Sequence, residues 1–131
     1  MSGNGNLPVG LRHKTGRHTK LRDLLADEKI LAAPGAFDCI SARLVQNAGF
    51  DALYLTGSGM SMSLMGSPDL GMLSYSEIMD HVRRITDTVE IPVIADADTG
   101  YGEAEMAART VVEYERNGAA GLHLEDQVFP K

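Results

Sequence analysis

The sequence has no tryptophan, a single cysteine and no long hydrophobic run. A single cysteine excludes an internal disulfide framework and is typical of proteins in a reducing compartment. Because no run of about 18 apolar residues is present, no membrane-spanning helix is expected, and the N-terminus shows no apolar signal-peptide core. These absences predict a cytoplasmic protein that does not bind membranes.

Basic and aromatic side chains are also scarce. The chain has 12 Lys and Arg residues against 18 Asp and Glu residues, a formal net charge of −6, and only 5% aromatic residues. The negative charge disfavours non-specific binding to nucleic acids, and the scarcity of aromatics argues against a stacking platform for single strands. What remains is a chain of 131 residues, 44% hydrophobic, with the composition of one globular domain that has a core.

The chain divides into a short arm and one globular region. Residues 1–18 are rich in Gly, Asn and basic side chains and lack hydrophobic periodicity, which predicts a flexible N-terminal arm. Residues 19–131 alternate apolar segments with helical ones. The predicted strands are 29–35, 51–59, 91–98 and 119–126, and the predicted helices are 19–26, 38–48, 74–89 and 103–117. A long glycine-rich loop is expected between the second strand and residue 74.

This alternation predicts an α/β fold with a parallel sheet, because strands that are apolar throughout are covered on both faces. Two architectures fit the order of elements: an open doubly wound sheet, or the first half of a (β/α)8 barrel. In both of them, ligands bind at the carboxyl ends of the strands.

Acidic residues follow three of the predicted strands. Asp96 and Asp98 share one face of the third strand, His123 and Glu125 share one face of the fourth, and Asp69 lies in the loop after the second. Carboxylates that meet at one sheet edge repel each other unless a hard divalent cation neutralises them. A purely structural role without a metal is the alternative, because a lone Asp-x-Asp is common and Asp98 fits the cap of a helix.

The segment TGSGMSMSLMG, residues 56–66, is too weak a match for a nucleotide-binding loop. It lacks the Lys of a P-loop, and Met62 stands where a dinucleotide fingerprint needs its third glycine. The backbone N–H groups around Thr56 to Gly59 remain suited to a carboxylate or another anion.

Four segments together resemble the isocitrate lyase and phosphoenolpyruvate mutase superfamily, in particular its 2-methylisocitrate lyase branch. They are APGAFDCISARLVQNAGFDALYLTGSG, GSPDLG, IPVIADADTGYG and GAAGLHLEDQVFPK, and the resemblance runs from about Leu21 to Lys131. It implies that residues 19–131 form about the first four βα units of a (β/α)8 barrel. It also implies a dependence on Mg²⁺, with Mn²⁺ as the alternative ion.

The resemblance also implies roles for individual residues. Asp96 matches the direct metal ligand of the family, and three further residues match those that hold the metal's waters: Asp69, Asp98 and Glu125. The positions that bind the substrate carboxylate in the family correspond to Tyr54, Thr56, Gly57, Ser58 and Asp96. His123 and Glu125 match the catalytic positions beside the metal. The family often has Ser where this chain has Thr56, which keeps the hydroxyl.

The implied reaction is cleavage of a carbon–carbon bond in a small 2-hydroxy di- or tricarboxylic acid similar to 2-methylisocitrate. The products are a 2-oxo acid and a carboxylic acid. Phosphonopyruvate or carboxyphosphonoenolpyruvate mutase and oxaloacetate decarboxylase chemistry are the alternatives within the superfamily.

In the lyases of this superfamily, EDQVFPK continues into a K-[KR]-C-G-H loop whose cysteine is the catalytic acid and base. That cysteine is expected beyond Lys131, so the alternative of another class is a truncated, catalytically inactive fragment. The full-length enzyme is expected to be a homo-oligomer, namely a tetramer.

Overall fold

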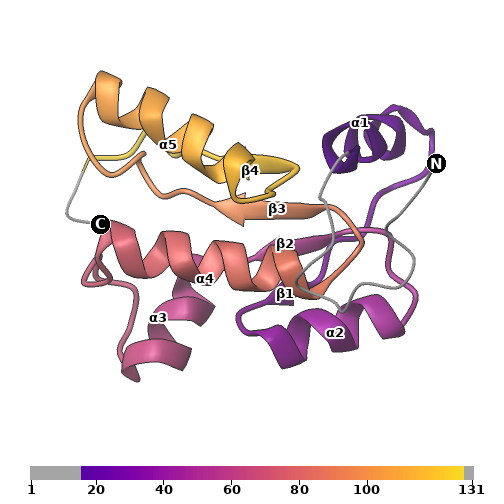
Figure 1. Ribbon diagram of the computed structural model, residues 1–131, viewed down its shortest axis with the longest axis horizontal. Helices are drawn as coiled ribbons and strands as arrows, with labels where there is room; N and C mark the ends of the chain where they lie inside the picture. Colours follow the sequence, from indigo (N-terminus) through magenta and orange to yellow (C-terminus); the bar gives the residue numbers. More distant parts are fainter. Residues whose placement is uncertain (1–15, 129–131) are drawn as a thin grey trace.

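The computed structural model describes residues 16–128, which form four strands and five helices (Figure 1). In chain order the elements are α1 (Arg17–Ala26), β1 (Gly35–Ala36), α2 (Cys39–Asn47), β2 (Leu53–Leu55), α3 (Gly57–Met65), α4 (Tyr75–Thr88), β3 (Val93–Asp96), α5 (Ala104–Arg116) and β4 (Gly121–His123). Most of the expected flexible arm, residues 1–15, lies outside the described residues.

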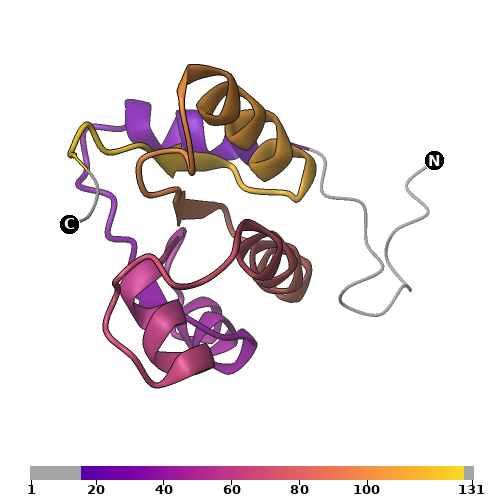
Figure 2. The same ribbon diagram turned by 90° about the vertical axis from the view of Figure 1, so that its left-hand side faces the viewer.

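The four strands form one parallel sheet in the order β1-β2-β3-β4. Sequential order decides between the two expected architectures, because right-handed crossovers between neighbouring parallel strands place every connecting helix on the same face. Helices α2, α4 and α5 contact one another in series, and α2 and α5 contact the strands. Figure 2 shows α4 and α5 along one side of the sheet. Sequential strand order with the helices on one side is the arrangement of a (β/α)8 barrel and not of a doubly wound sheet.

The strand register separates a helix-covered face from an inner face. Ala36, Leu55, Ala95 and Leu122 form one row across the sheet, and the first three are fully buried beneath the helices. The neighbouring positions on the opposite face are Tyr54, Ile94, Gly121, Asp96 and His123, and none of these is fully buried. The inner face is therefore the one on which functional side chains are accessible.

The helix boundaries that depend on local capping were predicted correctly. Asp38 caps α2 by accepting a hydrogen bond from the Ser41 N–H at 2.7 Å, and Ser74 caps α4 in a reciprocal capping box with Glu77. Gly49 follows α2 at φ 87°, as expected for a helix stop.

The prediction of a glycine-rich loop between the second strand and residue 74 is wrong over half of that segment. Residues Gly57–Met65 form α3, whose N-cap Thr56 accepts a hydrogen bond from the Gly59 N–H at 3.3 Å. Met60 and Ser61 are buried on this helix. Tertiary packing of one face thus overrides the low helix propensity of its glycines and serines.

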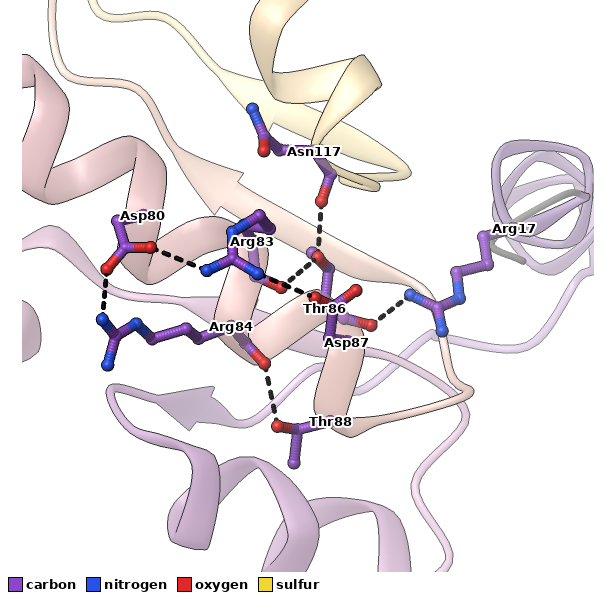
Figure 3. Close-up of polar contacts among 8 residues, drawn as sticks. All are labelled: Arg17, Asp80, Arg83, Arg84, Thr86, Asp87, Thr88 and Asn117. Atoms are coloured by element: carbon purple, nitrogen blue, oxygen red, sulfur yellow. Dashed lines mark hydrogen bonds and ion pairs between the residues drawn. The ribbon is translucent and has the colours of Figure 1, made fainter. Parts of the chain in front are cut away.

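The first helix also begins earlier than predicted, at Arg17 instead of after Thr19. Arg17 is buried and donates to the carbonyl oxygen of Thr86, near the C-terminal end of α4 (Figure 3). It also donates to the carbonyl oxygen of Val89, which directly follows that helix. It therefore belongs to the folded unit and not to the arm. Its guanidinium donates to carbonyls at the end of α4 that have no partner within that helix. Helix α1 itself lies beyond the amino ends of the strands (Figure 1).

The strands are shorter than the apolar runs that predicted them. β1 is Gly35–Ala36 and shares only Gly35 with the expected strand 29–35, because Pro34 has no N–H and supplies only its carbonyl, to the Tyr54 N–H. Among residues 16–128, no helix combines the length and the apolar character that a membrane span requires.

Candidate active site

A cavity of about 800 Å³ lies at the carboxyl ends of β3 and β4. Its walls come from the start of α3, the segment before α4, the β3–α5 loop and the segment after β4. The lining residues are Gly57, Met60, Ser61, Asp69, Gly71, Leu73, Tyr75, Ile78, Asp96, Asp98, Thr99, Tyr101, Gly102, Glu103, Glu125, Asp126, Gln127 and Val128. The expected position of the site, at the carboxyl edge of a parallel sheet, matches this cavity.

The cavity is strongly acidic. Among its described lining residues there is no Lys, Arg or His, whereas six carry carboxylates: Asp69, Asp96, Asp98, Glu103, Glu125 and Asp126. A concave surface lined by charges of one sign concentrates the field and attracts counterions. The arrangement therefore favours a cation in the cavity and disfavours an unaccompanied anion.

Asp96 lies at the centre of a hydrogen-bond network. Its Oδ2 accepts from the Gly57 N–H at 3.1 Å, and its Oδ1 accepts from the Asp98 N–H at 3.0 Å. A Cβ on Gly57 would lie 2.7 Å from Asp96 Oδ2 and 3.7 Å from Asp69 Oδ2. Only glycine therefore allows the start of α3 to approach these two carboxylates so closely.

The other two predicted carboxylates are joined through the backbone. The Glu125 N–H donates to the Asp98 carbonyl oxygen at 2.8 Å, which extends the β3–β4 pairing beyond the strands. Asp98 adopts a left-handed conformation with φ 50°. The side chain of Gln127 donates a hydrogen bond to the Glu125 carboxylate.

The donor chemistry of the cavity fits Mg²⁺ held mainly through water. Within residues 16–128, no three His, Cys, Asp or Glu side chains are close enough together to coordinate one ion directly. Mg²⁺ prefers oxygen ligands, keeps several waters and is commonly held by one or two carboxylates. Asp69 and Asp96, whose carboxylates both approach the start of α3, meet that requirement, and Asp98 and Glu125 line the same cavity.

Four of the predicted site residues do not line this cavity: Tyr54, Thr56, Ser58 and His123. His123 is nevertheless the register partner of Asp96, and its ring centroid lies 5.1 Å from that of Tyr54 at an interplanar angle of 40°. Ser58 is exposed in the first turn of α3. These four residues are therefore near cavity-lining residues in register or in sequence, but they do not line the cavity themselves.

A cluster of three tyrosines was not predicted; Tyr75 and Tyr101 line the cavity, and Tyr114 does not. The Tyr101 and Tyr114 hydroxyls are 2.9 Å apart, and the Tyr75 ring meets the Tyr101 ring edge-on at 5.5 Å. Burial, followed by the neighbouring Tyr101, raises the pKa of Tyr114, so its hydroxyl stays neutral and acts as a donor. Tyr101 could have been found from the sequence, because it lies in the TGYG turn directly after the predicted site residues Asp96 and Asp98. Tyr75 and Tyr114 could not, because they reach Tyr101 only through the packing of α4 and α5.

A family model described as phosphoenolpyruvate phosphomutase matches residues 21–131. The chain belongs to this family. The fold agrees with membership of the phosphoenolpyruvate phosphomutase family. The structural neighbours are (β/α)8 barrels, and the four parallel strands of this chain match part of such a barrel.

Individual relatives in the phosphoenolpyruvate phosphomutase family are similar over most of this chain. The chain is 48% identical over 112 residues to 2,3-dimethylmalate lyase from Eubacterium barkeri, covering 86% of this chain and 39% of the relative. It is 48% identical over 111 residues to 2-methylisocitrate lyase from Aeropyrum pernix, covering 85% of this chain and 36% of the relative. The crystal structure of phosphonopyruvate hydrolase complexed with oxalate and Mg²⁺ matches with a TM-score of 0.83 at 36% identity, covering 88% and 40%.

The chain therefore spans between 36% and 40% of the length of these relatives.

Proposed function

We propose that this chain provides the metal-binding and carboxylate-binding part of a carbon–carbon lyase site. The substrate is a small 2-hydroxy di- or tricarboxylic acid similar to 2-methylisocitrate. The observation that carries the proposal is the cavity with six carboxylates and no basic group among its described lining residues. An anionic substrate enters such a cavity only with a cation that offsets the repulsion. The names of two relatives, 2,3-dimethylmalate lyase and 2-methylisocitrate lyase, support this substrate class.

Asp96 is the proposed direct ligand of Mg²⁺ or Mn²⁺, and Asp69, Asp98 and Glu125 are proposed to hold its waters. The neighbour complexed with oxalate and Mg²⁺ supports the pairing of this ion with a small carboxylate. When bound, the ion supplies Lewis-acid stabilisation of negative charge on the substrate oxygens.

The N-terminus of α3 is proposed to bind the substrate carboxylate. Helix N-termini attract anions because their first N–H groups lack intrahelical partners and the helix dipole is positive there. The Gly57 N–H already donates to Asp96, which leaves Ser58 and the Thr56 hydroxyl as the proposed contacts. Tyr54, on the strand that leads into α3, is proposed to close this side of the site.

His123 and Glu125 are the proposed catalytic residues. One of them takes the proton of the substrate 2-hydroxyl, and the O–H electron pair forms the carbonyl of the 2-oxo acid. The adjacent carbon–carbon bond breaks, and its electron pair leaves with the carboxylate-stabilised fragment. Protonation of that fragment is assigned to the cysteine that follows EDQVFPK in the lyases, so these 131 residues alone are expected to be inactive. We also propose that the full-length enzyme is a homotetramer.

The description of the matching family favours a second candidate, mutase chemistry on phosphonopyruvate or carboxyphosphonoenolpyruvate. Oxaloacetate decarboxylation belongs with it, because both pass through a pyruvate enolate and need the same acidic cavity. The products distinguish the candidates: a lyase releases a 2-oxo acid from 2-methylisocitrate, and a decarboxylase releases carbon dioxide from oxaloacetate.

The metal part of the proposal is tested by titrating the 131-residue chain with Mn²⁺ and following free Mn²⁺ by electron paramagnetic resonance. Asp96→Asn is expected to weaken binding by about tenfold or more. Asp80→Asn is the matched control, because Asp80 lies on α4 outside the acidic cavity and pairs with Arg83 and Arg84. Equal affinities in the two variants would contradict the proposal.

The catalytic part is tested by incubating the chain with 2-methylisocitrate and Mg²⁺ and measuring the 2-oxo acid formed. No turnover is expected. A rate comparable to that of an efficient lyase would show that no residue beyond Lys131 is needed.

A further inference from the structure

Two buried side chains on one face of α5 hold the β3–α5 loop, one at its start and one at its middle. Tyr114 donates its hydroxyl to the Asp96 carbonyl oxygen at 2.9 Å, and Thr110 donates its hydroxyl to the Gly100 carbonyl oxygen at 3.0 Å. The two residues are one helical turn apart, and both are fully buried. We call this pair the α5 clamp. Neither residue is among those that line the acidic cavity.

The loop is conformationally strained between the two anchor points, at Asp98, and directly after the second one, at Tyr101. Asp98 and Tyr101 are both non-glycine residues in the left-handed region, with φ 50° and 63°. Such residues persist only where the surrounding structure determines them. The loop is also pressed against α5, because a Cβ on Gly100 would lie 2.7 Å from the Ala107 Cβ. The clamp residues are therefore in a position to maintain a backbone conformation that the loop does not favour by itself.

The clamped segment carries two of the four carboxylates proposed to bind the metal, Asp96 and Asp98, and its backbone anchors a third, Glu125. The Asp98 N–H orients Asp96 Oδ1, and the Asp98 carbonyl oxygen accepts from the Glu125 N–H. If the loop relaxed, the N–H of Asp98 would move away from Asp96, and Glu125 would lose its backbone anchor. A change at α5 would thus reach three carboxylates of the cavity without any contact between α5 and the ion.

We propose that Thr110 and Tyr114 are positioning residues that hold the Asp96–Gly100 backbone in the conformation needed to bind a divalent cation. This inference rests on the proposed function of the acidic cavity. Its physical basis is that partners outside the ligand shell, which orient the ligands, commonly change metal affinity by about 10- to 100-fold.

The first test compares Mn²⁺ affinities of the 131-residue chain. Tyr114→Phe and Thr110→Val remove one hydroxyl each with little change in shape, and each is expected to weaken Mn²⁺ binding by about tenfold. Thr110→Ser keeps the hydroxyl and is expected to retain most of the Mn²⁺ affinity of the unsubstituted chain. The variants' thermal unfolding midpoints are measured in parallel, so that unfolded samples are recognised.

The matched control is Thr86→Val. Thr86 is also a fully buried threonine whose hydroxyl donates to backbone carbonyls, those of Arg83 and Asn117, but it lies near the C-terminal end of α4 (Figure 3). It is expected to lower the unfolding midpoint without changing Mn²⁺ affinity. If Thr86→Val weakens binding as much as Tyr114→Phe, the effect is general destabilisation and the inference is overturned.

A second measurement does not depend on the metal. Amide hydrogen exchange of the Asp98 and Gly57 N–H groups, both of which donate to Asp96, is expected to become faster in Tyr114→Phe and Thr110→Val. Thr86→Val is expected to leave both exchange rates unchanged. Unchanged rates in the clamp variants would overturn the inference, whereas absence of Mn²⁺ binding in the unsubstituted chain would overturn the proposed function.

Discussion

The Gly57 N–H donates to Oδ2 of Asp96 over 3.1 Å, which joins the first residue of α3 to the last residue of β3. The two residues are 39 positions apart in the chain, so the contact exists only in the folded state. It holds the proposed metal ligand by its carboxylate while leaving further lone pairs on both oxygens for an ion or water.

Replacing Gly57 by Ala is expected to disturb Asp96 without adding charge. The new Cβ would lie 2.7 Å from Asp96 Oδ2, so either the carboxylate or the start of α3 must shift. We expect Mn²⁺ affinity of the 131-residue chain to fall about tenfold or more.

Gly35→Ala is the matched control for this variant. The nearest atom to a Cβ at Gly35 is 3.8 Å away, which is ordinary van der Waals contact. This variant is expected to bind Mn²⁺ as the unsubstituted chain does. Equal affinity in Gly57→Ala would show that the close approach of Gly57 to Asp96 does not matter for the ion.

Replacing Arg17 by Met is expected to detach α1 from the end of α4. Arg17 donates to two buried carbonyl oxygens, of Thr86 and Val89, and its loss leaves both without that donor. We expect the free energy of unfolding to fall by about 2–3 kcal/mol, measured by urea denaturation. Arg22→Met, at an exposed position of the same helix, is the control and is expected to change it by less than about 0.5 kcal/mol. Similar losses in both variants would contradict the anchoring role of Arg17.

The cap of α2 gives a prediction about pH. Hydrogen bonds from Ser41 hold the pKa of Asp38 below its ordinary value of 3.8. A carboxyl group with a lowered folded-state pKa contributes stability that is present above that ordinary value and is lost as the pH falls through the folded-state pKa. Asp38→Ala is therefore expected to lower the free energy of unfolding by about 1 kcal/mol at pH 7 and by progressively less below about pH 4. The comparison uses urea denaturation at several pH values, and a loss that does not shrink in acid would contradict it.

The parts of the fold that depend on nearest neighbours could be predicted from the sequence. The caps at Asp38 and Ser74 are made with residues three positions later, so the pattern is readable without knowledge of the fold. The acidic residues after the strands could be predicted as well, because parallel strands bring their carboxyl ends to one edge. Asp96, Asp98, Asp69 and Glu125 do line one cavity.

The parts that depend on tertiary packing could not be predicted. The sequence of α3, GSGMSMSLM, has weak helix propensity, and its helical form depends on the Thr56 cap and on burial of Met60. Likewise, Tyr114 meets the Asp96 carbonyl only because α5 packs back on the sheet. Neither the burial of Met60 nor the contact between Tyr114 and the Asp96 carbonyl leaves a signal in the local sequence.

A last prediction concerns the behaviour of the 131-residue chain in solution. Strand β1 and strand β4 each pair on one side only among the described residues, and such edges favour association with other chains. The outward face of α2 adds apolar surface, because Ile40 and Leu44, one turn apart, are 72% and 64% exposed. We therefore expect the chain to self-associate in a concentration-dependent way, measured by size-exclusion chromatography with light scattering.

The contribution of α2 is separated from that of the strand edges by substitution. Changing Ile40 and Leu44 to Lys together is expected to raise the fraction of monomer, because the apolar pair is removed and charge is added. Asn47→Lys, at an exposed position of the same helix, adds charge without removing apolar surface and is expected to have little effect. A rise in monomer with Asn47→Lys alone would assign the effect to charge. A folded monomer of the unsubstituted chain at all concentrations would contradict the prediction, because it would mean that neither the edges nor the α2 face drives association.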